Sequence, residues 1–68
     1  MNAYTITIRN LYTSKRRTVQ VEDVDPMVAH KYIYMRELKS DEEIYNIINS
    51  KETVVFDSKN GFLQATKV

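Results

Sequence analysis

The sequence predicts a small two-layer α+β domain of order ββααββ. It would have a four-stranded, mostly antiparallel sheet made of two hairpins, with two helices on one face. Three observations lead to this fold class. Segments near both ends alternate apolar and polar residues with a period of two, the middle of the chain carries helix start signals at Asp25 and Ser40, and 68 residues suffice for one domain spanning 1–68.

Two strands are expected in the N-terminal third of the chain. Ala3–Asn10 alternates apolar residues with threonine and arginine, and Arg17–Val21 repeats the pattern. If Thr13–Arg16 forms the turn, Ile8 pairs with Val21, and the apolar faces of both strands agree. The segment therefore predicts a hairpin with one face toward the core.

A helix is expected from Asp25 to Leu38. Asp25 suits the N-cap because its carboxylate can accept a hydrogen bond from a free backbone N–H, and Pro26 suits the first helical position. Within it, Lys31–Met35 is rich in aromatic and β-branched residues and would also suit a strand. That alternative stays open at this point.

The expected helix has more apolar side chain than one small core can use. Steps of about 100° per residue place one apolar arc toward the core, formed by Leu38, Met35, Val28 and Tyr32, with Ala29 at its margin. The opposite side carries His30, Ile33, Tyr34 and Glu37. Because tyrosine is enriched in protein interfaces, we predict a protein interface on these four residues. In the alternative, the helical phase differs by about 40° and Ile33 belongs to the core beside Ala29.

A second, short helix is expected after Ser40. Ser40 and Glu43 form a capping-box pattern, and acidic residues between them favour the positive end of a helix dipole. The apolar stripe of this helix would be Ile44, Ile47 and Ile48, and it would end near Ser50.

The C-terminal segments Thr53–Asp57 and Phe62–Lys67 predict a second hairpin. Asn60-Gly61 between them is typical of a tight turn, because both residues tolerate positive φ. A two-residue turn there pairs Phe56 with Ala65.

Charge is unevenly distributed along the chain. The net charge is +1, but residues 1–20 contribute +4, residues 21–43 contribute −4 and the remainder +1. The basic hairpin predicts nucleic-acid contact as a second function, through Arg9, Tyr12, Lys15, Arg16 and Arg17. The competing interpretation is that these cations keep a hairpin tip soluble.

Enzymatic and metal chemistry have little support in the sequence. There is no cysteine, one histidine and one glycine, so a thiol nucleophile and a glycine-rich phosphate loop are both absent. His30 and Glu37 could be drawn as an acid–base pair, but a lone helical histidine is far more often a surface residue. Asp23 and Asp25 lack the glycine and glutamate that a calcium loop requires. We therefore expect no enzyme, no cofactor and no metal.

The functional expectation is a small non-enzymatic protein-binding module in the cytoplasm, without a membrane span. In size and in its richness in Lys, Asn, Ile and Tyr, the chain resembles the accessory proteins of bacteriophages, many of which inhibit a host enzyme or defence complex. That resemblance implies an inhibitor or modulator that docks on a protein partner. A nucleic-acid-binding protein is the alternative, and a homodimer is compatible with so small a domain.

Overall fold

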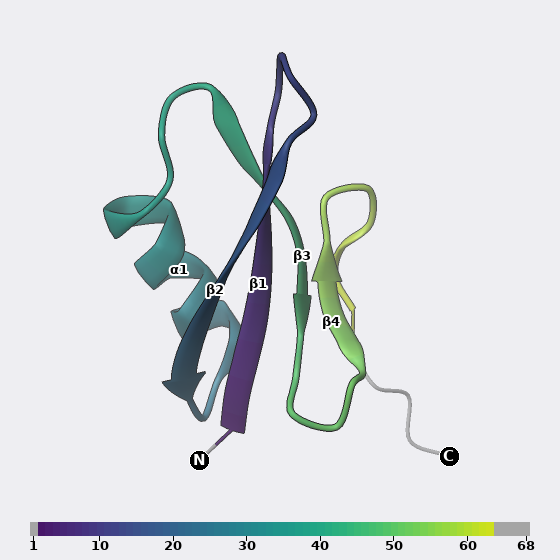
Figure 1. Ribbon diagram of the computed structural model, residues 1–68. Coiled ribbons are helices and arrows are strands. Elements are labelled where there is room, and N and C mark those ends of the chain that lie inside the picture. Colours follow the sequence, from purple (N-terminus) through teal and green to yellow (C-terminus); the bar gives the residue numbers. More distant parts are fainter. Residues whose placement is uncertain (1, 64–68) are drawn as a thin grey trace.

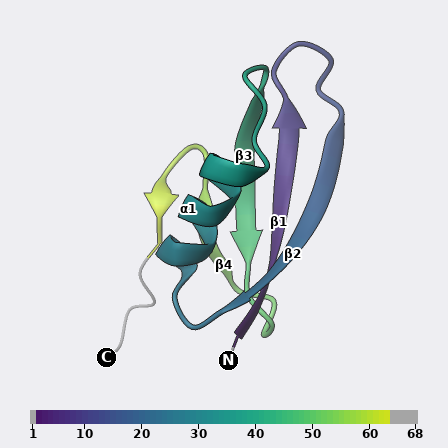
Figure 2. The ribbon, with the colours of Figure 1, turned by 90° about the vertical axis from the view of Figure 1, so that its left-hand side faces the viewer.

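The computed structural model describes residues 2–63 and has a five-stranded antiparallel sheet covered on one face by a single helix (Figures 1 and 2). The elements are β1 (Asn2–Asn10), β2 (Arg16–Asp23), α1 (Pro26–Arg36), β3 (Glu42–Ile48), β4 (Val54–Asp57) and β5 (Gly61–Phe62). The α+β class is as expected, but the predicted four strands and two helices in the order ββααββ are wrong. The strands lie in the order β2-β1-β3-β4-β5.

β1 is hydrogen-bonded on both edges, and its alternating side chains divide the two faces of the sheet. Tyr4, Ile6 and Ile8 point toward α1 and are at most 2% exposed. Thr5 and Thr7 point to the opposite face, which no element within residues 2–63 covers. The period of two in the sequence therefore predicted this strand and its buried face correctly.

The core lies between α1 and the three central strands. Its buried members are Tyr4, Ile6, Ile8, Ala29, Ile33, Ile44 and Ile47, and Val19, Val21, Leu38, Val55 and Phe56 pack at its edges. Only two of these buried residues come from α1, so contact between the two layers depends on a short length of helix.

α1 begins as the sequence predicts. The carboxylate of Asp25 accepts a hydrogen bond from the Met27 N–H at 2.9 Å, and Pro26 occupies the first turn. Lys31–Met35 is helical throughout, which resolves the alternative of a strand there. The helix ends two residues before Leu38, where the Glu37 N–H still donates to the Ile33 carbonyl at 2.9 Å.

The second predicted helix is instead β3. Ile44 and Ile47 are three residues apart, which is typical of a helix face, yet both lie on the core face of this strand. A β-bulge explains the spacing, because Ile8 pairs with Ile44 and Thr7 with Asn46, so that Tyr45 has no partner of its own on β1. The extra residue shifts the alternation by one and brings both isoleucines to the same side.

Both hairpins differ from the predicted registers. In the first, Ile8 pairs with Arg17 and Ile6 with Val19, so the expected pairing of Ile8 with Val21 is wrong by four residues. The loop lies two residues earlier than predicted and is closed by the Asn10 side chain, whose Oδ1 accepts hydrogen bonds from two loop N–H groups at 2.8 and 2.9 Å. An even shift leaves the same side chains facing the core.

In the second hairpin, Phe56 pairs with Phe62 rather than with Ala65. Gly61 has φ 78, as the Asn-Gly pattern suggested, but it lies in β5 and the Asp57 carboxylate closes the turn by accepting from the Lys59 and Asn60 N–H groups at 2.9 and 2.6 Å. Most of the predicted strand Phe62–Lys67, including Ala65, lies outside the described residues.

Ile33→Ala should lower the free energy of unfolding by about 2–5 kcal/mol, because it removes buried methylene groups and leaves a cavity under α1. Val28→Ala is the matched control on the same helix and should change it by less than about 1 kcal/mol, since Val28 is half exposed. Urea unfolding followed by circular dichroism measures both. Equal losses in the two variants would contradict this assignment of the core face.

Candidate functional site

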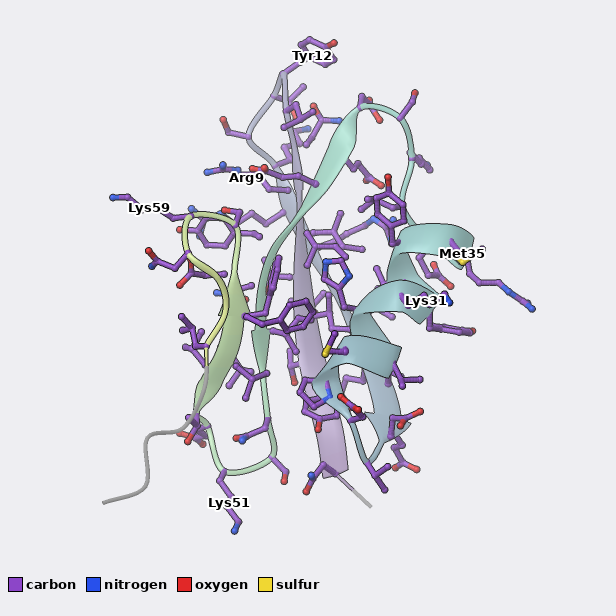
Figure 3. All side chains as sticks on the ribbon, turned by 180° about the vertical axis from the view of Figure 1, so that it is seen from behind. Arg9, Tyr12, Lys31, Met35, Lys51 and Lys59 are labelled. Atoms are coloured by element: carbon purple, nitrogen blue, oxygen red, sulfur yellow. The ribbon has the colours of Figure 1, made fainter. Side chains whose placement is uncertain are left out.

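α1 presents an apolar surface to solvent on the side opposite the sheet. Val28, Tyr32 and Met35 follow one another at helical spacing and are 49, 46 and 70% exposed. Lys31 and Arg36 flank them, and the five residues together line a shallow depression. Figure 3 shows Lys31 and Met35 pointing away from the sheet. We call these five residues the outer stripe.

The phase of α1 therefore differs from the predicted one. Val28, Tyr32 and Met35 were expected in the core and are on the surface, whereas Ile33 was expected in the interface and is fully buried. The alternative phase, with Ile33 in the core beside Ala29, is the one that the structure has. Apolar residues occur on every side of this helix, so their spacing does not distinguish a core face from a surface face.

The other predicted interface residues do not form one surface with the outer stripe. Tyr34 is 63% exposed and its ring stacks on that of His30, with ring centroids 6.3 Å apart. His30 is half buried and packs on Phe56 and Phe62, at 4.7 and 5.2 Å between ring centroids. Because its ring is partly removed from water, the pKa of His30 is lowered. His30 thus connects α1 with β4 and β5, at the edge of the sheet opposite β2.

Glu37 and Arg17 belong to an ionic cluster between the end of α1 and the sheet. The Arg17 guanidinium donates to both carboxylate oxygens of Glu42, at 3.0 and 3.1 Å, and to the Glu37 carbonyl at 2.9 Å. The hydrogen bond from Arg17, with a further one from the Lys39 N–H, lowers the pKa of Glu42. Arg17 therefore helps to hold the connection between α1 and β3, and it lies on the other face of the sheet from Arg9 and Arg16.

The other basic residues of the predicted nucleic-acid site lie on the uncovered face of the sheet and at the tip of the β1–β2 hairpin. They are Arg9, Lys15 and Arg16. The guanidinium carbons of Arg9 and Arg16 are each 4.7 Å from the centroid of the Tyr45 ring. Arg9 also forms an ion pair with Glu43, whereas Arg16 and Lys15 have no carboxylate partner within residues 2–63. Tyr12 is 83% exposed at the hairpin tip (Figure 3).

A hollow of about 480 Å³ adjoins this basic group on the uncovered face. Its wall includes Arg9, Tyr45, Asn46 and Asp57, and Asn46 Oδ1 is buried with no hydrogen-bond donor among residues 2–63. This grouping could not be predicted from the sequence, because the bulge that places Tyr45 beside Arg9 depends on the pairing of distant strands.

Within residues 2–63, no group of three or more His, Cys, Asp or Glu side chains is arranged to hold a metal ion, and no helix is long and apolar enough to cross a membrane. Comparison of the chain with protein-family models, with curated proteins and with solved structures gives no match.

Acidification from pH 7.5 to pH 5.5 should destabilise the protein through His30. Burial lowers the folded-state pKa, so the unfolded chain binds more protons below about pH 6.5, and stability is lost as pH falls from that value toward the folded-state pKa. His30→Phe keeps an aromatic ring against Phe56 and removes the only histidine of the chain. Urea unfolding at several pH values should show a smaller loss in this variant, and identical losses would contradict the assignment.

Proposed function

We propose that this protein is a non-enzymatic docking module that binds a protein partner through the outer stripe of α1. The observation that carries the proposal is the exposure of Val28, Tyr32 and Met35 side by side on the only helix within residues 2–63. Large apolar side chains that a small domain leaves in water at adjacent positions are typical of interaction surfaces. Tyrosine and methionine are also among the residues enriched in interfaces.

The charge of α1 defines the chemistry of the partner. Pro26–Arg36 contains no acidic residue, and the outer stripe carries Lys31 and Arg36 at its margins. The Arg36 guanidinium carbon lies 5.9 Å from the Tyr32 ring centroid, so the cation is held next to the apolar surface. A complementary partner surface has an apolar centre with carboxylates around it.

Docking of this kind would act by covering a surface of the partner. In this proposal the module inhibits or modulates a cytoplasmic enzyme or defence complex, as the resemblance to bacteriophage accessory proteins implies. No catalytic group of this chain is needed for that effect.

Nucleic-acid binding is the second candidate. Tyr12, Lys15 and Arg16 favour it, because an exposed aromatic ring and two cations without carboxylate partners within residues 2–63 lie at one end of the sheet. Three groups offer few phosphate contacts, so this site would bind weakly and with strong salt dependence.

The test places a photo-crosslinking amino acid at Met35, and at Lys51 in the exposed turn between β3 and β4 as the control position. We expect a single partner to crosslink from position 35 and not from position 51, through a peptide rich in carboxylates. Tyr32→Ala should weaken binding of that partner by about tenfold or more, as loss of an interface anchor does. Titration calorimetry with the purified partner measures the change.

Matched controls lie on the hairpin tip. Tyr12→Ala and Lys15→Glu should leave the affinity unchanged, whereas Lys31→Glu should reduce it and charge reversal of a facing carboxylate on the partner should restore it. Loss of binding with the hairpin variants, together with binding of a labelled single-stranded oligonucleotide, would favour the second candidate and contradict the first. Crosslinking of position 35 only to another copy of this chain would also contradict it.

A further inference from the structure

β2 is a long strand at the edge of the sheet. All eight of its residues, Arg16–Asp23, pair with β1, and no strand within residues 2–63 pairs with its other side. In Figure 2 the upper part of β2 runs to the right of β1 with no other element beyond it. An edge of this length is a template for another strand.

The hydrogen-bonding groups along that free edge follow from the hairpin register. The Asn10 N–H donates to the Lys15 carbonyl at 2.8 Å, so this is a hydrogen-bonded pair, and such pairs recur at every second position of an antiparallel ladder. The backbone groups of Arg17, Val19, Val21 and Asp23 therefore point toward β1. Those of Arg16, Thr18, Gln20 and Glu22 point outward.

We infer that β2 pairs with β2 of a second copy of this chain, antiparallel about a two-fold axis through Val19, to form a continuous ten-stranded sheet. In this register Arg16 lies opposite Glu22 of the second copy, and Thr18 lies opposite its Gln20. Every outward-pointing backbone group then has a partner, and Val19 meets its own symmetry mate on the helix side of the sheet.

Charge complementarity selects the second copy as occupant. The strand reads Arg-Arg-Thr-Val-Gln-Val-Glu-Asp, with both cations at one end and both acids at the other. Antiparallel self-pairing brings Arg16 and Glu22 together twice, whereas parallel pairing places like charges side by side. Charges on an edge strand usually discourage pairing, but this distribution favours antiparallel pairing of two copies over parallel pairing.

Neither Arg16 nor Glu22 has a competing ion pair. Both side chains are exposed, and neither forms an ion pair within residues 2–63. Pairing requires the Arg16 guanidinium to move from its place over the Tyr45 ring toward the edge of β2. Their neighbour Arg17, by contrast, is already bound to Glu42 on the opposite face. The arrangement leaves the outer stripe of both copies uncovered, because the two-fold axis keeps both α1 helices on the same face of the joined sheet.

Sedimentation equilibrium over a series of protein concentrations tests the proposal. We expect the mass to rise with concentration to twice the chain mass of 8.0 kDa. Arg16→Glu and Glu22→Arg should each raise the dimer dissociation constant by about tenfold or more, because each substitution replaces two attractions with two repulsions. The double variant restores both pairs and should dimerise like the wild type, and the two single variants, when mixed, should form a heterodimer.

Gln20→Pro tests the backbone pairing separately. It removes an outward-pointing N–H that β1 does not use, so the monomer should stay folded by circular dichroism while the dimer is lost. Gln20→Ala keeps that N–H and is the matched control. A wild-type chain that stays monomeric at millimolar concentration would overturn the proposal. So would a dimer that resists every β2 variant but is broken by Tyr32→Ala, or an association in which β2 binds only a foreign strand.

Discussion

The fold depends on the burial of one face of β1. This strand is paired on both edges, and its three core residues lie at 0–2% exposure between the neighbouring strands and α1. α1 contributes only Ala29 and Ile33 to the fully buried set, so the two layers meet over a small area. With so little apolar surface to bury, the domain relies on polar links as well, above all the bonds from Arg17 to Glu42 and to the Glu37 carbonyl.

Those parts of the fold that are set by local chemistry could be predicted from the sequence. β1 was predicted from its strict alternation of apolar and polar residues. The start of α1 was predicted from Asp25 and Pro26, because a helix cap acts only on the few residues that follow it. β3 could not be predicted in the same way, because its bulge at Tyr45 gives a strand the isoleucine spacing of a helix. The phase of α1 could not be decided between its two alternatives, since large apolar side chains occur both on the buried side, at Ile33, and on the exposed side, at Val28, Tyr32 and Met35.

The candidate sites also could be predicted only in part, because residues that are adjacent in the sequence need not be close in the structure. Arg16 and Arg17 are adjacent in the sequence and were grouped as one basic site, but successive strand residues point to opposite faces. Arg16 lies over Tyr45 on the uncovered face, while Arg17 turns toward α1 and is held by Glu42. The composition of α1 was enough to infer that the helix has more apolar side chains than the core can bury. Which of them reach solvent depends on packing.

The position of β1 between β2 and β3 has a consequence for how the chain folds as it is synthesised. The β1–β2 hairpin and α1 are made first, and Ala29 and Ile33 can then cover Tyr4, Ile6 and Ile8. The second edge of β1 stays open until β3 emerges from the ribosome, because Thr5 pairs with Ile48. Closure of this non-local ladder completes the sheet, and until then the nascent chain exposes the strand that later becomes its most protected element.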